Sequence, residues 1–144
     1  MNPTAAELAA ERAEYKRLVE EGAWFVFGSN EAGHHGGGAA RDAYDYFGAE
    51  WGVGWGFTGW CFAFPTKDEN IQTLPMSRIA DYVAAFLEIA ASYPSETFAV
   101  TRLGCGLAGL QDEDMAPLFR NAPQNCLLPS RWVAILEMEA SNVA

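Results

Sequence analysis

GSNEAGHHGGGAARDAY, residues 28–44, joins the apolar run 23–27 to a segment whose alanines and aromatic residues have helical spacing. A short apolar run bounded by glycines is typical of a buried strand, and residues 38–47 are predicted to form a helix. The five glycines between the two leave bare backbone, whose N–H groups can hold an anion at a helix start. The stretch therefore predicts a strand–glycine loop–helix unit, the building block of an α/β fold.

A second unit of the same kind spans residues 97–119. The apolar run 97–103 leads into Gly-Cys-Gly-Leu-Ala-Gly, residues 104–109, and Asp112 is expected to cap a short helix that ends near Phe119. No acidic residue follows at a strand end about 20 residues later, so a Rossmann-type dinucleotide fold is not supported. The glycines fit either an anion-binding loop or a tight turn that needs positive φ.

The remaining segments complete an alternation of helices and strands. Helices are predicted over residues 4–21, where Thr4 and Glu7 form a capping box, and over 77–93, where Ser77 is the expected cap. Strands are predicted at 60–64, 126–128 and 132–138, and the glycine-rich residues before 60 fit an edge strand or a mobile loop. We expect one α/β domain over residues 1–144, with a mixed, largely parallel sheet. An N-terminal helix (1–22) precedes the core (23–138). Because ligands bind beyond the carboxyl ends of strands in such sheets, the two glycine loops should meet there.

Composition narrows the classes of partner. The chain of 144 residues has a formal charge of −10 and two lysines, Lys16 and Lys67. Duplex nucleic acid requires clustered Lys and Arg, which are missing, whereas backbone amides can still bind a small phosphate ligand. The sequence has no apolar run of membrane-spanning length and no signal-peptide pattern, and its three cysteines are widely spaced. These features predict a cytoplasmic protein without a membrane partner.

Four side-chain features remain open to more than one interpretation. His34 and His35 are adjacent and point apart, with no Cys or His at ligand spacing, so no metal or cofactor is predicted. Cys105 fits a small buried thiol better than a nucleophile. Lys67 ends a predicted buried strand and is either a surface charge or a site amine able to form a Schiff base. The tryptophans within 51–60 could stack on a base, cover the core or form a subunit contact, which would make a homo-oligomer.

Gly28-Ser-Asn30 followed by Gly-Gly-Gly-Ala-Ala resembles the first loop of macrodomains, which are α/β/α modules that bind ADP-ribose. The segments 64–67 (Phe-Pro-Thr-Lys) and 100–107 (Val-Thr-Arg-Leu-Gly-Cys-Gly-Leu) resemble the branch that contains terminal ADP-ribose glycohydrolase. The chain also looks like a small macro-like family of bacteria and phages. The resemblance covers roughly residues 23–138 and implies a three-layer α/β/α fold.

The resemblance also implies site residues. Lys67 matches the lysine that attacks the distal ribose and releases a glutamate side chain. The implied ligand contacts are Gly28, Ser29, Asn30, His35, Gly36, Gly37, Gly38, Thr66, Gly104, Cys105, Gly106, Leu107, Ala108 and Gly109.

Two departures from the family pattern bear on activity. Ala108 stands where the branch has its catalytic aspartate, so Asp68, Asp112 or Asp114 would have to substitute. A charged helix replaces the usual first strand, whose aspartate reads adenine in the family. The expected function is binding of ADP-ribose or a related nucleotide-ribose, free or on an ADP-ribosylated macromolecule, with hydrolysis of ADP-ribosyl linkages as an extension. The alternatives are a non-catalytic reader or sponge of such a signal, as in phage defence or counter-defence, and an interaction module built on the tryptophans.

Overall fold

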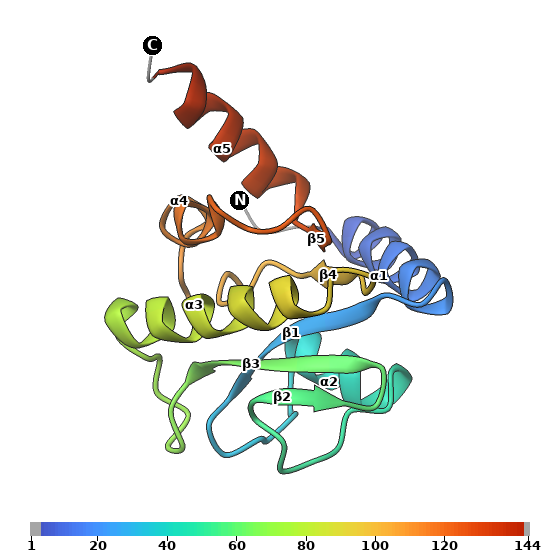
Figure 1. Ribbon diagram of the computed structural model, residues 1–144. Coiled ribbons are helices and arrows are strands. Elements are labelled where there is room, and N and C mark those ends of the chain that lie inside the picture. The colour runs from blue at the N-terminus through green and yellow to red at the C-terminus, as the bar shows by residue number, and fades with distance from the viewer. Residues whose placement is uncertain (1–3, 143–144) are drawn as a thin grey trace.

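The computed structural model describes residues 4–142, which form helices and strands in alternation (Figure 1). In chain order the elements are α1 (Ala5–Glu20), β1 (Trp24–Asn30), α2 (Gly38–Tyr46), β2 (Gly56–Thr58), β3 (Cys61–Lys67), α3 (Met76–Ser92), β4 (Phe98–Val100), α4 (Asp112–Met115), the 3-10 helix η1 (Ala116–Phe119), β5 (Cys126–Leu127) and α5 (Ser130–Ser141).

The five strands form one mixed sheet in the order β2-β3-β1-β4-β5. β1 lies at the centre and runs parallel to β3 and β4, and β5 runs parallel to β4. β2 is the antiparallel edge strand, which settles the predicted choice between edge strand and loop. The expected α/β class with a mixed, largely parallel sheet is confirmed. The carboxyl ends of β1, β3 and β4 therefore lie at the same edge of the sheet.

Side chains of the central strands alternate between two hydrophobic cores. Phe25 and Phe27 of β1 pack with Ala40 and Ala43 of α2 on one face. The intervening Val26 belongs to the larger core on the other face, which includes residues of α3, η1 and α5. Helices thus cover both faces of the sheet, as the two-residue period of a strand buried on both sides requires.

The helix ends agree with the sequence at α1 and differ elsewhere. Thr4 and Glu7 form the expected capping box at α1. Ser77 does not cap α3, because the helix begins one residue earlier, after Pro75. Asp112 does not cap α4 either: Gln111 holds the cap position, and the Asp112 carboxylate is engaged with other side chains.

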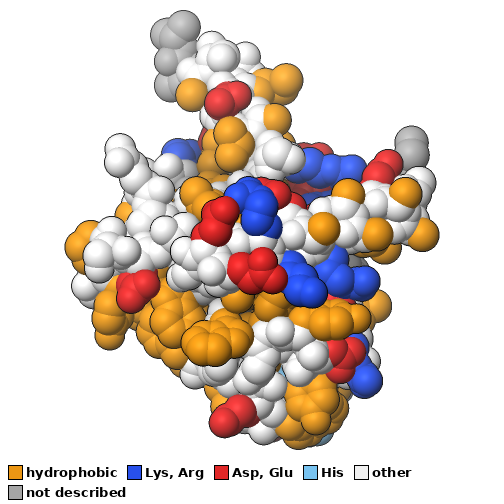
Figure 2. Space-filling model, turned by 90° about the vertical axis from the view of Figure 1, so that its right-hand side faces the viewer, with side chains coloured by type: hydrophobic (Ala, Val, Ile, Leu, Met, Phe, Trp, Pro, Cys, Tyr) orange, Lys and Arg blue, Asp and Glu red, His pale blue; other side chains and the backbone are white. Residues whose placement is uncertain are grey.

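The strand predicted at 132–138 is wrong, because this segment is part of helix α5. Pro129 starts the helix, and only Trp132 is fully buried, against Phe119 of η1 with 5.0 Å between ring centroids. The apolar residues after Trp132 lie on a helix that projects from the body (Figures 1 and 2), so their run does not mark a buried strand. Within residues 4–142, no helix is long and apolar enough to cross a membrane.

Candidate functional site

A cleft of about 990 Å³ opens at the carboxyl ends of β1, β3 and β4. The first glycine loop (residues 31–37) and the second glycine loop (residues 104–109) both contribute to its wall, as expected for two loops that follow parallel strands. Thirteen of the sequence-predicted site residues line it: Gly28, Ser29, Asn30, Gly36, Gly37, Gly38, Thr66, Lys67, Gly104, Cys105, Gly106, Leu107 and Ala108. His35, Asp68, Gly109 and Asp112 do not.

Two sets of backbone amides in the lining of this cleft donate to no acceptor within residues 4–142. At the start of α2, the N–H groups of Gly38, Ala39 and Ala40 precede the first intrahelical bond, which Arg41 donates to the Gly37 carbonyl. In the second loop the amides of residues 106–108 donate to no acceptor within residues 4–142. A helix start and a run of free amides are both favourable places for an anion.

The second glycine loop is shaped by a tight turn. Gly104 has φ +77°, and a Cβ there would lie 2.5 Å from Leu110 Cδ1, so no other residue fits without distortion. The amide of Leu110 donates back to the Gly104 carbonyl at 2.8 Å. Gly109 closes the turn through its amide, 3.0 Å from the Gly106 carbonyl. The turn and the anion-binding interpretations are compatible, because the turn leaves the amides of residues 106–108 free.

Asn30 holds the first glycine loop instead of offering its side chain freely to the cleft. Its Oδ1 accepts from the His34 amide at 3.0 Å, and its Nδ2 donates to the His34 carbonyl at 2.8 Å. Asn30 lines the cleft but is 7 % exposed, and these two bonds occupy both ends of its amide. Its main role in this structure is to position His34.

His35 lies beneath the loop and not in the cleft wall, unlike the predicted ligand contact. The imidazole is fully buried, with Nδ1 3.2 Å from Ser29 Oγ and Nε2 2.8 Å from the Glu50 carbonyl. Burial lowers the pKa of His35, so the ring is neutral at pH 7. His35 joins β1 to the segment after α2 and supports the loop from below.

Lys67 is half-buried at the last position of β3, and it lines the cleft. Its Cα pairs with that of Asn30, and its carbonyl accepts from the Glu31 amide at 2.9 Å. Its ammonium forms no ion pair with any carboxylate of residues 4–142. Thr66, beside it, donates its hydroxyl to the Ser29 carbonyl at 3.4 Å. The strand pairing therefore presents an amine with no protein counter-ion to the cleft.

Two of the three aspartates proposed as partners for Lys67, Asp68 and Asp112, are engaged elsewhere. Asp68 Oδ1 accepts from the amides of Asn70 and Gln72 at 2.8 and 3.0 Å and so stabilises the turn after β3. Asp112 accepts from Arg102 Nε and Nη2 at 2.9 and 2.6 Å, and from the Trp132 indole at 2.8 Å. These bonds, that of Arg102 above all, lower the pKa of Asp112 to about 2. Asp112 is thus a structural ion and not a proton donor near neutral pH.

Two other residues of the second loop have clear local roles. Burial, with the nearby Asp112, raises the pKa of Cys105 to about 12, so its thiol stays protonated at pH 7. This agrees with the small-thiol interpretation. The Ala108 carbonyl accepts from the Thr73 hydroxyl at 2.9 Å, which ties the loop to the segment after β3.

Sequence reasoning missed the end of the cleft that α1 forms. Leu8, Glu11, Arg12 and Tyr15 line this end, and Arg12 pairs with Asp42 of α2 at 3.2 Å. The spacing of these four residues predicts that they share one face of a helix. It does not predict which part of the protein that face contacts. Trp51 and Arg102 also line the cleft.

The tryptophans within 51–60 do not form one cluster. Trp51 lies at the cleft, and Trp55 packs on Phe62 with 5.1 Å between ring centroids. Trp60 is 64 % exposed beyond β2. A subunit contact through this region stays a prediction.

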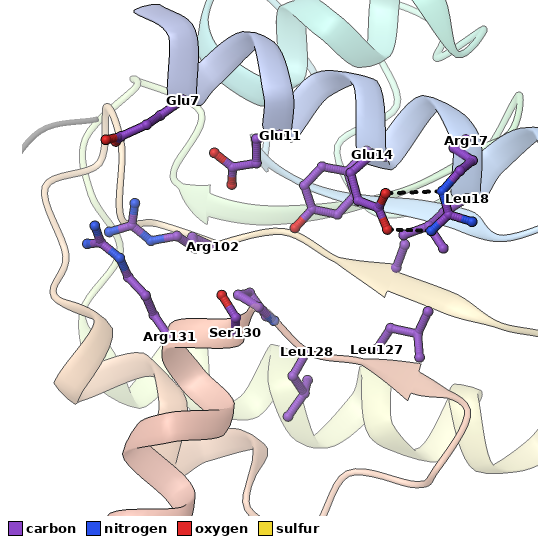
Figure 3. A pocket seen from close by; sticks show the side chains of 13 residues that line it. Glu7, Glu11, Glu14, Arg17, Leu18, Arg102, Leu127, Leu128, Ser130 and Arg131 are labelled. Carbon is purple, nitrogen blue, oxygen red and sulfur yellow. Dashed lines mark hydrogen bonds and ion pairs between the residues drawn. The ribbon is translucent and has the colours of Figure 1, made fainter. Parts of the chain in front are cut away.

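A second, smaller cavity of about 640 Å³ lies between α1 and the junction of β5 with α5 (Figure 3). Glu7 and Glu11 point into it from α1, and Arg102 and Arg131 from the opposite side (Figure 3). Arg102 is already bound by Asp112, and Arg131 lies 3.8 Å from the same carboxylate. The basic side of this cavity is therefore largely neutralised from within the protein.

Within residues 4–142, no three His, Cys, Asp or Glu side chains gather in a way that could hold a metal ion. Comparisons with protein-family models, with curated proteins and with solved structures find no match for this chain.

Proposed function

We propose that the cleft binds ADP-ribose or a closely related nucleotide-ribose. The proposal rests on two sets of backbone amides that line the cleft, those of residues 38–40 and those of residues 106–108. Neither set has an acceptor within residues 4–142. A diphosphate accepts hydrogen bonds from both sets at once, and backbone amides hold it without side-chain charge. This suits a chain of net charge −10, in which Lys and Arg side chains occur in small groups between acidic and hydrophobic ones (Figure 2).

The remaining cleft residues supply what the sugars of such a ligand need. A cleft of about 990 Å³ lies at the upper end of the range for small-molecule and cofactor sites. Thr66 and Lys67 offer a hydroxyl and an ammonium beside the second glycine loop, where a ribose joined to the diphosphate would lie. The resemblance of the segments 28–40, 64–67 and 100–107 to macrodomain motifs supports the same ligand class.

Recognition without chemistry, as by a reader or sponge of an ADP-ribose signal, is the function that the charge distribution favours. The acidic residues of the cleft wall are Glu11 and Asp42, which lie on α1 and α2 and not beside Lys67. Asp42 is already paired with Arg12. A lysine-assisted cleavage needs an acid–base partner near the anomeric carbon, and Ala108 provides none.

Hydrolysis of an ADP-ribosyl linkage is the second candidate function, and Lys67 is the observation in its favour. In its neutral form this amine can attack the anomeric carbon of the ribose. The bond to the leaving group breaks, and that group takes the electron pair and the proton that the lysine nitrogen loses. Water would then release ADP-ribose and restore the lysine.

A thermal-shift panel tests the binding proposal. ADP-ribose, ADP, AMP and ribose 5-phosphate are each added to the full chain at millimolar concentration. A ligand at 100 times its Kd stabilises the fold by about 2.7 kcal/mol. We expect the largest shift with ADP-ribose, a smaller one with ADP and none with AMP. No shift with any diphosphate would overturn the proposal.

A further inference from the structure

An aromatic pair lies at the rim of the cleft and is not needed by either hydrophobic core. The imidazole of His34 stacks on the indole of Trp51, with 5.4 Å between ring centroids and 21° between planes. Both residues line the cleft, and Trp51 remains 52 % exposed. Tyr44 contacts the indole edge-on, at 5.8 Å. A large aromatic surface is thus held in place with much of it open to solvent.

The two rings come together because their backbones are fixed to each other. The Gly52 amide donates to the Gly33 carbonyl at 2.8 Å, and a Cβ on Gly33 would lie 2.3 Å from the Gly52 carbonyl carbon. Only glycine allows so close an approach at this position, where φ is +73°. His34 and Trp51, each next to one of these glycines, are therefore brought side by side by the loops that carry them.

Buried hydrogen bonds then fix the orientation of the pair. Asn30 brackets the backbone of His34 through two bonds, and His35 binds the Glu50 carbonyl at 2.8 Å. The first two bonds hold His34 itself. The third joins the residue after His34 to the residue before Trp51. A preorganised aromatic surface loses little conformational entropy when a planar ring binds to it.

The same network places the pair on the side of the cleft where Lys67 lies. Asn30 is the strand partner of Lys67 and also the residue that holds His34. Helix α1 lines another part of the cleft, through Leu8, Glu11 and Tyr15. A ring on the aromatic pair would therefore be joined to the sugar nearest Lys67, and not to the sugar at the α1 end.

Resting on the proposed function, we infer that His34 and Trp51 form a stacking platform for a planar heteroaromatic ring carried by the distal ribose of the ligand. The preferred ligand is then a dinucleotide-like molecule with a ring at both ends, and not ADP-ribose with a free anomeric hydroxyl. Stacking suits this class because any heteroaromatic ring offers a π face, and an indole also attracts a cationic ring such as nicotinamide.

Calorimetric titration of the full chain with ADP, ADP-ribose and NAD⁺ tests the inference. Stacking of one base on an aromatic side chain contributes about 1–3 kcal/mol, so NAD⁺ should bind about 5- to 150-fold more tightly than ADP-ribose. Trp51→Ala should remove this advantage and leave the affinity for ADP within about twofold. Trp60→Ala removes an exposed indole outside the cleft. It should change neither the affinity for ADP nor the tighter binding of NAD⁺.

The outcomes separate the inference from the proposed function. If ADP and ADP-ribose bind but NAD⁺ is no tighter, or if Trp51→Ala leaves the NAD⁺ advantage intact, the platform is overturned and the binding proposal stands. If Trp51→Ala weakens ADP as much as NAD⁺, the platform holds the proximal base, which also contradicts the inference. If no diphosphate binds at all, the proposed function itself has failed.

Discussion

Leu107 of the second glycine loop reaches across the cleft to Gly37 of the first. A Cβ on Gly37 would lie 2.9 Å from Leu107 Cδ1, and one on Gly38 would lie 3.5 Å from the same atom. Leu107 is 72 % exposed, so this contact does little for the core. It bridges the two loops that line the cleft, and in the proposed binding mode it would cover a diphosphate held by their amides.

Leu107→Ala should therefore alter ligand exchange and not stability. We expect a change in the free energy of unfolding within about 0.5 kcal/mol, as for most surface substitutions, together with faster ligand dissociation. Stopped-flow displacement of bound ADP-ribose measures the rate. Met138→Ala, which truncates a residue of similar exposure on α5, should leave the rate unchanged. Equal dissociation rates in both variants and the parent protein would contradict a covering role.

Lys67→Ala should weaken binding of ADP-ribose by about 1–3 kcal/mol, the range for hydrogen bonds to charged groups. The reason is that Lys67 is the cleft ammonium without a counter-ion among residues 4–142. Lys16→Ala, at the only other lysine of the chain, is the control and should bind normally.

The same variant distinguishes the reader from the hydrolase. If Lys67 attacks the ribose, borohydride added during incubation with a mono-ADP-ribosylated protein should trap a lysine–ribose adduct, detectable by mass spectrometry. A reader gives neither adduct nor free ADP-ribose. Release of ADP-ribose by the parent protein but not by Lys67→Ala would establish the enzyme.

Asp112 should be important for stability. Asp112→Asn keeps the shape of the side chain but leaves Arg102, which donates two bonds to it, without its counter-ion. We expect a loss of about 2–3 kcal/mol in the free energy of unfolding by urea denaturation. Asp114→Asn, an exposed position of the same helix, should cost less than about 0.5 kcal/mol. A similar small loss in both variants would mean that the ion pair does not anchor the loop.

Stability should fall in mild acid because of His35. Burial lowers its pKa below the ordinary 6.5, so below that pH the unfolded chain binds a proton that the folded chain does not. The stabilisation is present above about pH 6.5 and is lost as the pH falls, at up to about 1.4 kcal/mol per pH unit. The free energy of unfolding is measured by urea denaturation at several pH values between 7.5 and 5.5. Its dependence on pH should be weaker in His35→Gln than in the parent protein and unchanged in His34→Gln. The opposite ranking of the two variants would contradict the assignment to His35.

Much of the fold could be predicted from local patterns. Residues 25–27 and 61–64 are buried, so the continuous apolar runs 23–27 and 60–64 identified the strands, and the glycines after residue 27 marked the loop. The error at 132–138 arose because an apolar run on a helix with one fully buried residue, Trp132, resembles a strand. Ile135 and Leu136 pack against the core only in part, and nothing local in the sequence shows this.

The candidate site could be predicted only in part, for a similar reason. Loop residues were found because glycine loops after parallel strands converge at one edge of the sheet. The burial of His35 and the pairing of Asp112 with Arg102 depend on tertiary contacts, which the sequence does not show. His35 was therefore predicted to contact the ligand, and Asp112 to take part in catalysis. The contribution of α1 to the cleft also follows from packing, and no motif marks it.

Binding of ADP-ribose through backbone amides is the central claim, and Gly106→Val tests it most directly. A Cβ at Gly106 would meet no atom within 4 Å, so the variant should fold normally while its side chain occupies the space beside the free amides. In calorimetric titration, the parent protein should bind ADP-ribose with one site per chain. Gly106→Val should give no binding heat at the same concentrations, with an unchanged urea denaturation midpoint. Absence of binding by the parent protein, or equal affinity in a folded Gly106→Val variant, would contradict the claim.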